Sequence, residues 1–163
     1  MQERASFKRV GEVIGDDLLS SDAVIVGSPV YVGNMSGQVK TFFANGGSKF
    51  GLGTGTGKMR NKVGAAFATG GGISSGKEIT MFTILGAMLI HQMIVISGGG
   101  GFGASATTGP DSPGIDGRRA QKLTTWASGL RKSPLLSNGD LASNADVISN
   151  PGSNALMTAV YTQ

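Results

Sequence analysis

Short apolar runs and amphipathic segments alternate along this chain. The runs Ala23–Gly27 and Lys62–Thr69 are compact and rich in small or β-branched residues, which predicts two buried strands. Apolar residues at helical spacing predict one short helix over about Ser6–Ile14 and another over Ser36–Ala44, with Asn45-Gly46-Gly47 as its stop signal. Strands that alternate with helices predict a parallel sheet with helices on both faces.

The longest apolar stretch, Ile79–Ile96, contains no charged residue. Its length is at the lower limit for a membrane-spanning helix, but polar residues interrupt it and it closes on β-branched residues. We therefore expect a buried helix that ends at about His91 and a strand over Met93–Ser97, with a membrane span as the alternative. The pattern Ser75-x-x-Glu78 is typical of a capping box and predicts that this helix begins there.

The remaining two fifths of the chain show weaker patterns. Gly98–Pro113 is expected to be a long loop and Asp116–Arg131 a last helix, with acidic residues at its start and basic ones at its end. Ser133–Gln163 is rich in Ser, Asn and Gly and is expected to be a loosely ordered tail. The expected organisation is thus one α/β domain over residues 1–132, with about three visible strands, and a tail over 133–163.

Composition narrows the class of protein further. The chain has 163 residues, no cysteine, one histidine and a net charge of +4, so neither a disulfide framework nor a Cys- or His-rich metal site is expected. The basic residues are scattered, whereas nucleic-acid binding favours a dense stripe. The first ten residues are too polar for a signal peptide, so we expect a cytoplasmic protein without a membrane span, with peripheral membrane association left open.

The segment Ser21–Asn34 carries the most specific signal. Its strand ends in Gly27-Ser28-Pro29, and in open α/β sheets ligands bind on loops that follow the carboxyl ends of strands. The pattern S-D-A-x-I-x-G-S-P-x-Y-x-G-N-M-S-G-Q-x-K-x-F, which starts at Ser21, resembles the third strand and flavin loop of flavodoxin-like NAD(P)H:quinone oxidoreductases of the WrbA type. The resemblance implies a flavodoxin-like three-layer fold, FMN as cofactor, and two-electron hydride transfer from NADH or NADPH through the flavin to a quinone.

The resemblance also implies where the site lies. A second loop, Ala68–Glu78, is similar to the family's fourth-strand loop, and the sole histidine precedes the expected fifth strand. From the residues alone a lone histidine at a helix end is more often structural, whereas the resemblance gives it a catalytic role as a hydrogen-bond and proton donor. Aromatic residues at two further positions are expected to contact the substrate. The cofactor-binding set is Ser28, Pro29, Val30, Tyr31, Val32, Gly33, Asn34, Thr69, Gly70, Gly71 and Gly72; the catalytic residue is His91; the substrate-binding residues are Phe50 and Phe102.

The resemblance begins only partway into the family's fold. The first strand and the loop that wraps the FMN phosphate have no counterpart here, so an N-terminally truncated fold is expected, in which Ala23–Gly27 has an open edge. The alternative function is therefore a catalytically inactive flavodoxin-like fragment, or a protein-binding module without a cofactor. In either case a homo-oligomer is expected, because a helix that is apolar all round suggests a subunit interface. The sequence does not determine which quinone would be used.

Two glycine-rich patterns are misleading. Gly71-x-x-x-x-Gly76-Lys77 nearly matches a phosphate-binding P-loop, but Glu78 stands where Ser or Thr should bind magnesium. Gly98-x-Gly-x-x-Gly103 matches a dinucleotide-binding string, but no helix is expected to follow it. Neither an NTPase nor a dinucleotide-binding βαβ unit is predicted.

Overall fold

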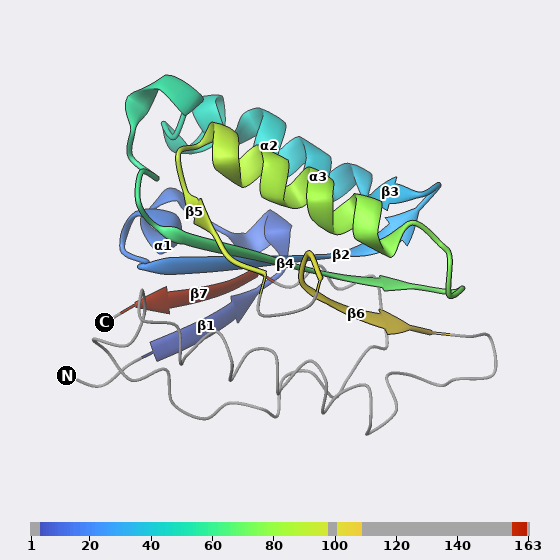
Figure 1. Ribbon diagram of the computed structural model, residues 1–163. Helices are drawn as coiled ribbons and strands as arrows, with labels where there is room; N and C mark the ends of the chain where they lie inside the picture. The colour runs from blue at the N-terminus through green and yellow to red at the C-terminus, as the bar shows by residue number, and fades with distance from the viewer. Residues whose placement is uncertain (1–3, 98–100, 109–157, 163) are drawn as a thin grey trace.

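A computed structural model describes residues 4–97, 101–108 and 158–162 (Figure 1). These residues form a seven-stranded sheet with the order β1-β7-β2-β4-β5, in which β3 pairs with β2 and β6 pairs with β4. The strands are β1 Arg4–Lys8, β2 Ala23–Tyr31, β3 Asn34–Met35, β4 Val63–Gly70, β5 Ile94–Val95, β6 Ala104–Thr107 and β7 Thr158–Thr162. The α-helices are α1 Gly15–Leu19, α2 Gly37–Phe50 and α3 Lys77–Ile90, and two 3-10 turns, η1 and η2, cover Val10–Glu12 and Thr54–Thr56.

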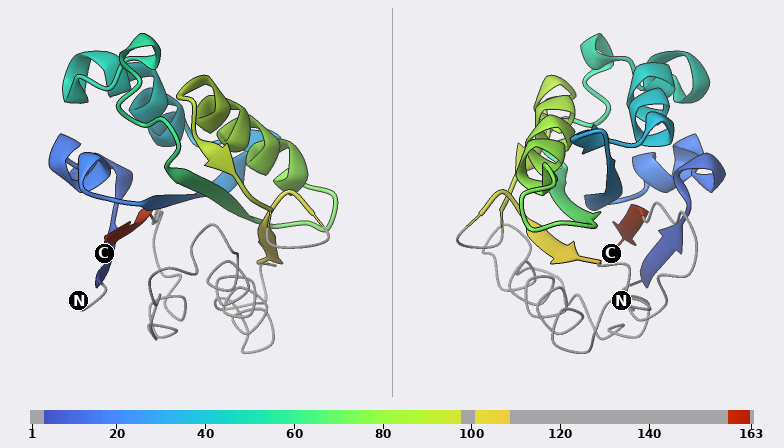
Figure 2. Two further views of the ribbon diagram at one scale, coloured as in Figure 1. Left: turned by 60° about the vertical axis from the view of Figure 1, so that its left-hand side comes forward. Right: turned by 90° about the vertical axis from the view of Figure 1, so that its right-hand side faces the viewer.

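The centre of the sheet is the parallel pair β2 and β4, in register from Ala23 beside Val63 to Pro29 beside Thr69. Both strands were expected from their apolar runs, and the α/β class is confirmed. Helices α2 and α3 lie side by side on one face of this pair (Figure 2). The buried core between the helices and the sheet includes Val24, Val26, Val39, Ala66, Ala68, Ile84 and Met88. The expected helix Asp116–Arg131 lies outside the described residues.

The beginning of the chain differs from the prediction. In place of a helix over Ser6–Ile14, residues Arg4–Lys8 form β1, which pairs along its whole length with β7 in antiparallel orientation. This pairing satisfies the backbone N–H and C=O groups of β1 through hydrogen bonds to β7. A single short helix would have to satisfy them within itself, and such helices are marginally stable. The apolar residues that suggested a helix are partly used after the strand, because Val10, Val13 and Leu18 are buried in the common core.

Strand β7 also corrects the expectation of an open edge. Residues Ala23–Val26 of β2 pair antiparallel with β7, so this part of β2 is paired on both sides and the sheet is mixed. β7 comes from the segment that was expected to be a loosely ordered tail; the rest of that segment lies outside the described residues. Ser133–Gln163 has little periodicity, and such a short strand is specified by its partners more than by its own sequence.

Helix α2 runs past its predicted stop. Residues Asn45-Gly46-Gly47 lie inside the helix, which ends six residues after Ala44, at Phe50, where Gly51 adopts a left-handed conformation with φ of 62°. The buried side of the helix explains this, since Val39, Gly46 and the half-buried Phe50 continue the helical spacing toward the core. Tertiary packing therefore carries the helix through two glycines whose intrinsic propensity opposes it.

The long apolar run divides as predicted into a helix and a strand. Helix α3 ends at Ile90 with His91 as its C-cap, and β5 follows within the expected Met93–Ser97. Among the described residues, no helix has the length and apolar character needed to cross a membrane. The expected loop Gly98–Pro113 contains strand β6, which pairs parallel with residues 67–70 of β4.

Candidate functional site

Three strands bring their carboxyl ends to one edge of the sheet. Pro29 of β2 lies beside Thr69 of β4, and Gly70 lies beside Thr107 of β6. The two segments that the sequence singled out lie at this edge. The prediction that the first strand ends at Gly27 is wrong, because β2 continues to Tyr31, and the second segment likewise begins inside β4. Ligands of open α/β sheets bind at this kind of edge, so the topology alone makes it the candidate site.

The first loop is a tight hairpin between β2 and β3. Val30 pairs with Met35 and Tyr31 with Asn34, so Val32 and Gly33 form a two-residue turn. Both have positive φ, 49° for Val32 and 74° for Gly33, as a type I′ turn requires. A β-branched residue is strained in this conformation, and the Val32 side chain is fully exposed while that of Tyr31 is half exposed. The turn thus projects apolar side chains from the edge of the sheet.

Ser28 connects the base of this hairpin to helix α2 through hydrogen bonds. Its side chain is 2% exposed; its hydroxyl donates to the Pro29 carbonyl (2.7 Å) and accepts from the Ser36 N–H (2.9 Å). Ser36 is the N-cap of α2, and its own hydroxyl accepts from the Val39 N–H. The Ser28 hydroxyl therefore links the end of β2 to the start of α2. It would contribute to a ligand site by holding the hairpin in place.

The two loops touch at a pair of glycines. Gly76, the N-cap of α3, has φ of 87°, and a Cβ atom placed on it would lie 2.7 Å from the Gly33 carbonyl oxygen and 2.9 Å from Gly33 Cα. The hairpin is also tied to α3, because the Thr83 hydroxyl donates to Asn34 Oδ1 at 2.9 Å. The two loops are thus brought together at Gly33 and Gly76, and Pro29 at the base of the first loop lies beside Thr69 at the base of the second.

The predicted capping box at the start of α3 does not form. The helix begins one residue later, with Gly76 as an N-cap that makes no side-chain bond, and the Ser75 hydroxyl donates instead to the Gly72 carbonyl (2.9 Å). The side chain of Lys77 is buried, and its Nζ donates to the carbonyls of Gly72 (2.5 Å) and Ile73 (3.0 Å) and to Thr107 Oγ1 (3.0 Å). The sequence showed Lys77 only as part of the incomplete P-loop pattern, and nothing in it pointed to Thr107. Because this ammonium points into its own loop, it does not extend toward a phosphate as a P-loop lysine does.

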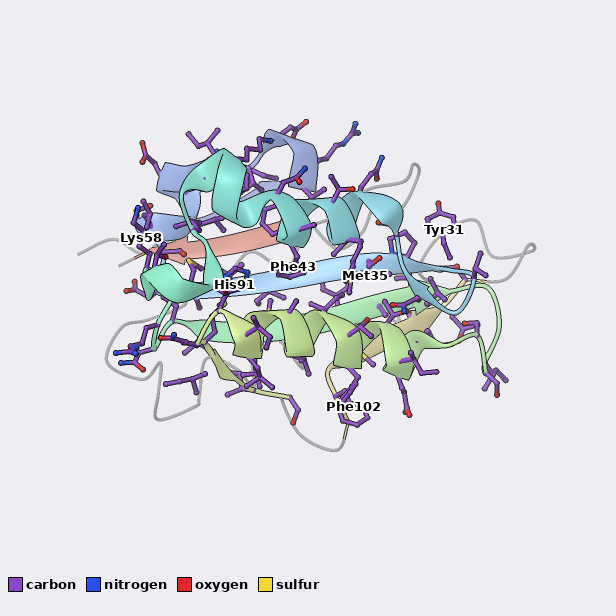
Figure 3. All side chains as sticks on the ribbon, turned by 90° about the horizontal axis from the view of Figure 1, so that it is seen from above. Tyr31, Met35, Phe43, Lys58, His91 and Phe102 are labelled. Atoms are coloured by element: carbon purple, nitrogen blue, oxygen red, sulfur yellow. The ribbon has the colours of Figure 1, made fainter. Side chains whose placement is uncertain are left out.

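His91 and Phe50 are not brought to this edge. His91 follows the C-terminal end of α3, whereas the loops meet at its N-terminal end, and fourteen residues of helix span about 20 Å. Figure 3 shows His91 at the end of the sheet opposite Tyr31. Both residues line a cavity of about 40 Å³ whose walls also include Phe42, Phe43, Leu52, Met59 and Met88. Within this chain the structure therefore does not bring the two residues to the flavin loops, because they lie at the C-terminal ends of α2 and α3. Their substrate-binding and catalytic roles stay predictions.

The surroundings of His91 suit a structural residue. Burial lowers the pKa of the imidazole, and a hydrogen bond with the Leu52 backbone acts in the opposite direction. The neutral ring is therefore favoured in the folded chain, among apolar neighbours. The interpretation of His91 as a structural residue, like the catalytic role that the resemblance implies, stays a prediction.

Phe102 precedes the start of β6 and lies on the outer side of α3. Its ring packs edge to face on Phe82 with 5.4 Å between ring centroids, and both side chains are exposed. Figure 3 places Phe102 beyond α3, on the side away from Tyr31. The structure thus separates Phe102 from the hairpin by the width of a helix.

Comparison with known proteins agrees with this architecture. Residues 6–107 match the family model described as NADPH-dependent FMN reductase. An iron-sulfur flavoprotein of Methanocaldococcus jannaschii is 39% identical over 94 residues, which is 58% of this chain and 46% of that protein. A flavodoxin of Clostridium saccharobutylicum is 36% identical over 90 residues, 55% of this chain and 51% of that protein.

Two further similarities are to a quinone dehydrogenase and to a solved flavodoxin structure. An NAD(P)H dehydrogenase (quinone) of Trichlorobacter lovleyi is 31% identical over 123 residues, 66% of this chain and 58% of that protein. The crystal structure of a flavodoxin, WrbA-like protein from Agrobacterium tumefaciens shares the fold, with a TM-score of 0.53 and 20% identity over 70% of this chain and 69% of that one. The chain spans about half the length of the curated relatives it matches. Because the family model covers more than half of the chain, this protein belongs to the flavodoxin-like NADPH-dependent FMN reductase family.

Proposed function

We propose that the edge formed by the two loops binds the ring system of FMN and that the protein transfers two electrons from NAD(P)H to a quinone. The observation that carries this proposal is the contact between Gly33 and Gly76, which joins the two loops that resemble flavin loops at one edge of the sheet. The family supports flavin binding, and the 31% identical quinone dehydrogenase favours a quinone as acceptor.

The residues at this edge fit a flat, largely apolar ring with one polar border. Tyr31, Val32 and Ile73 are exposed apolar side chains on the two loops, able to cover a ring face. The glycines of the second loop allow backbone N–H and C=O groups to approach a ligand closely. When bound, FMN would supply the hydride acceptor and donor, and the role of the chain is to hold it, orient it and exclude water.

His91 has no part in this proposal. A proton donor for the reaction would have to come from a group at the loop edge or from solvent, since the imidazole lies beyond the far end of α3. The chain also contains no cysteine, so it supplies no thiolate ligand for an iron–sulfur cluster. A soluble two-electron acceptor such as a quinone is therefore favoured over electron transfer through a cluster held by this chain.

The direct test is a titration of the purified chain with FMN, followed by flavin fluorescence. Saturable quenching at micromolar FMN is expected, and the flavin-loaded protein should oxidise NADH or NADPH with a quinone as acceptor. A chain that leaves FMN fluorescence unchanged would favour the alternative function, a module without a cofactor. Binding without quinone-dependent turnover would keep the flavin site and reject the quinone.

We also propose that the protein is a homo-oligomer joined through the outer face of α3. Ile79, Phe82, Leu89 and Ile90 lie on that face and are each more than half exposed. Together they offer on the order of 500 Å² per copy, against about 800 Å² per partner in a standard interface, so a second copy could bury an apolar centre of adequate size. Sedimentation velocity should show concentration-dependent association that Phe82→Glu abolishes; a monomer at all concentrations would contradict the proposal.

A further inference from the structure

Lys77 is a buried cation for which the family resemblance gives no role. The whole residue is 8% exposed although it carries a charge at neutral pH. Burial of an ammonium group is unfavourable unless it is paired or hydrogen-bonded. Its partners include two consecutive backbone carbonyls, Gly72 and Ile73, and the hydroxyl of Thr107 on strand β6.

These bonds fix the direction of two peptide groups. A trans peptide is planar, and its N–H points away from its C=O. When the carbonyls of Gly72 and Ile73 point toward Lys77, the N–H groups of Ile73 and Ser74 point to the opposite side of the loop. Neither N–H has a hydrogen-bond acceptor among the described residues, and both residues are exposed. The loop thus directs the N–H groups of Ile73 and Ser74 away from Lys77, while the carbonyls of Gly72 and Ile73 accept hydrogen bonds from the lysine.

We infer that Lys77 is a positioning residue that sets the second loop to recognise an electronegative ligand border with the N–H groups of Ile73 and Ser74. This inference rests on the proposed function, because the ligand expected at this edge is the flavin ring, whose polar border carries carbonyl oxygens. Successive N–H groups that converge on one side of a turn are a recurring anion- and oxygen-binding arrangement. The hydrogen bond from Lys77 to Thr107 also connects the second loop to β6, so the loop is held by contacts with that strand as well as by its own connection to β4.

The fold offers a matched control for this role. Lys62, at the start of β4 and so at the opposite end of that strand, also donates its ammonium to backbone carbonyls, those of Leu19 and Ser21. Replacing either lysine with methionine removes a charge and its bonds to carbonyls but keeps the apolar stem. Only the change at Lys77 should affect the loop that meets the ligand.

The experiment compares wild type, Lys77→Met, Lys62→Met and the milder Thr107→Val by amide NMR and FMN titration. In wild type, FMN should shift the Ile73 and Ser74 amide signals along the same saturation curve as the fluorescence. Lys77→Met should raise the Kd for FMN by about tenfold or more and reduce those shifts, whereas Lys62→Met should leave both unchanged. Thr107→Val should show a smaller change in the same direction and serves if Lys77→Met does not fold.

The outcomes separate this inference from the proposed function. If wild type binds FMN and Lys77→Met binds it equally, with the same Ile73 and Ser74 shifts, the positioning role is wrong. If wild type does not bind FMN, the proposed function fails. The positioning role of Lys77 is then tested in the ligand-free protein. There, ¹⁵N relaxation of residues 72–74 should show greater motion in Lys77→Met than in Lys62→Met; equal order in the two variants would overturn the inference.

Discussion

Replacing Gly76 with alanine should separate the two loops of the candidate site. The residue has φ of 87°, and the new Cβ would lie 2.7 Å from the Gly33 carbonyl oxygen, closer than real contacts allow. The neighbour is backbone and not the end of a flexible side chain, so one of the loops must move.

The magnitude follows from two effects. A non-glycine residue in the left-handed region costs about 1–2 kcal/mol, and an overpacked contact that shifts backbone costs about 1–3 kcal/mol. We therefore expect Gly76→Ala to reduce the free energy of unfolding by about 2–5 kcal/mol, which lowers Tm by roughly 4–20 °C in a chain of this size. FMN affinity should fall as well, because the turn at Gly33 is displaced from the second loop.

Gly86 provides the matched control in the same helix. An added Cβ there has nothing within 4 Å, and the residue lies in the helix interior. Gly86→Ala should stabilise the protein by about 0.5–1 kcal/mol, because alanine has the higher helix propensity and loses less backbone entropy on folding. Its FMN affinity should equal that of wild type.

Thermal unfolding followed by circular dichroism, together with FMN titration of each variant, is the assay. The reasoning predicts opposite signs for one chemical change at two positions ten residues apart. If Gly76→Ala unfolds at the same temperature as wild type and binds FMN equally, the contact between the loops does not hold the site. Destabilisation by Gly86→Ala at low protein concentration would show that the helix interior is not open there.

Three further substitutions test the surrounding structure. Burial lowers the folded-state pKa of His91 below the usual 6.5, so the unfolded chain binds more protons and stability should fall as pH drops through about 6.5; His91→Gln should remove this slope in urea unfolding and leave FMN affinity unchanged. Burial raises the pKa of Asp17, but bonds from the Ile14 N–H and from Lys8, with the lysine charge, outweigh it and lower the pKa overall. The stability from Asp17 is therefore present above its unfolded pKa of about 3.8 and lost as pH falls further, and Asp17→Asn should flatten acid unfolding there. Ser36→Ala removes the N-cap of α2 and should reduce the unfolding free energy by about 1 kcal/mol in a denaturant titration.

The sequence by itself determined the elements whose signals are local. The apolar runs at β2 and β4 are buried on both faces, and such strands appear as continuous apolar segments. The Ser21–Asn34 motif contains β2 and the turn after it, and the second glycine loop leaves the end of β4, so their meeting at one edge followed from parallel pairing alone. Helix α3 was also evident, because its apolar run is long and ends in a β-branched strand.

Only the tertiary structure decided the pairing and the distances. β1 and β7 pair across 150 or more positions of sequence, and neither has a pattern that specifies it alone. The position of His91 depended on the direction of α3, which carries the histidine away from the edge where the helix begins. The role of Lys77 arose from three acceptors on two segments, and no spacing in a linear sequence reports a contact with Thr107, thirty residues away. Local periodicity determines where helices and strands form, whereas long-range contacts determine which side chains come together in one site.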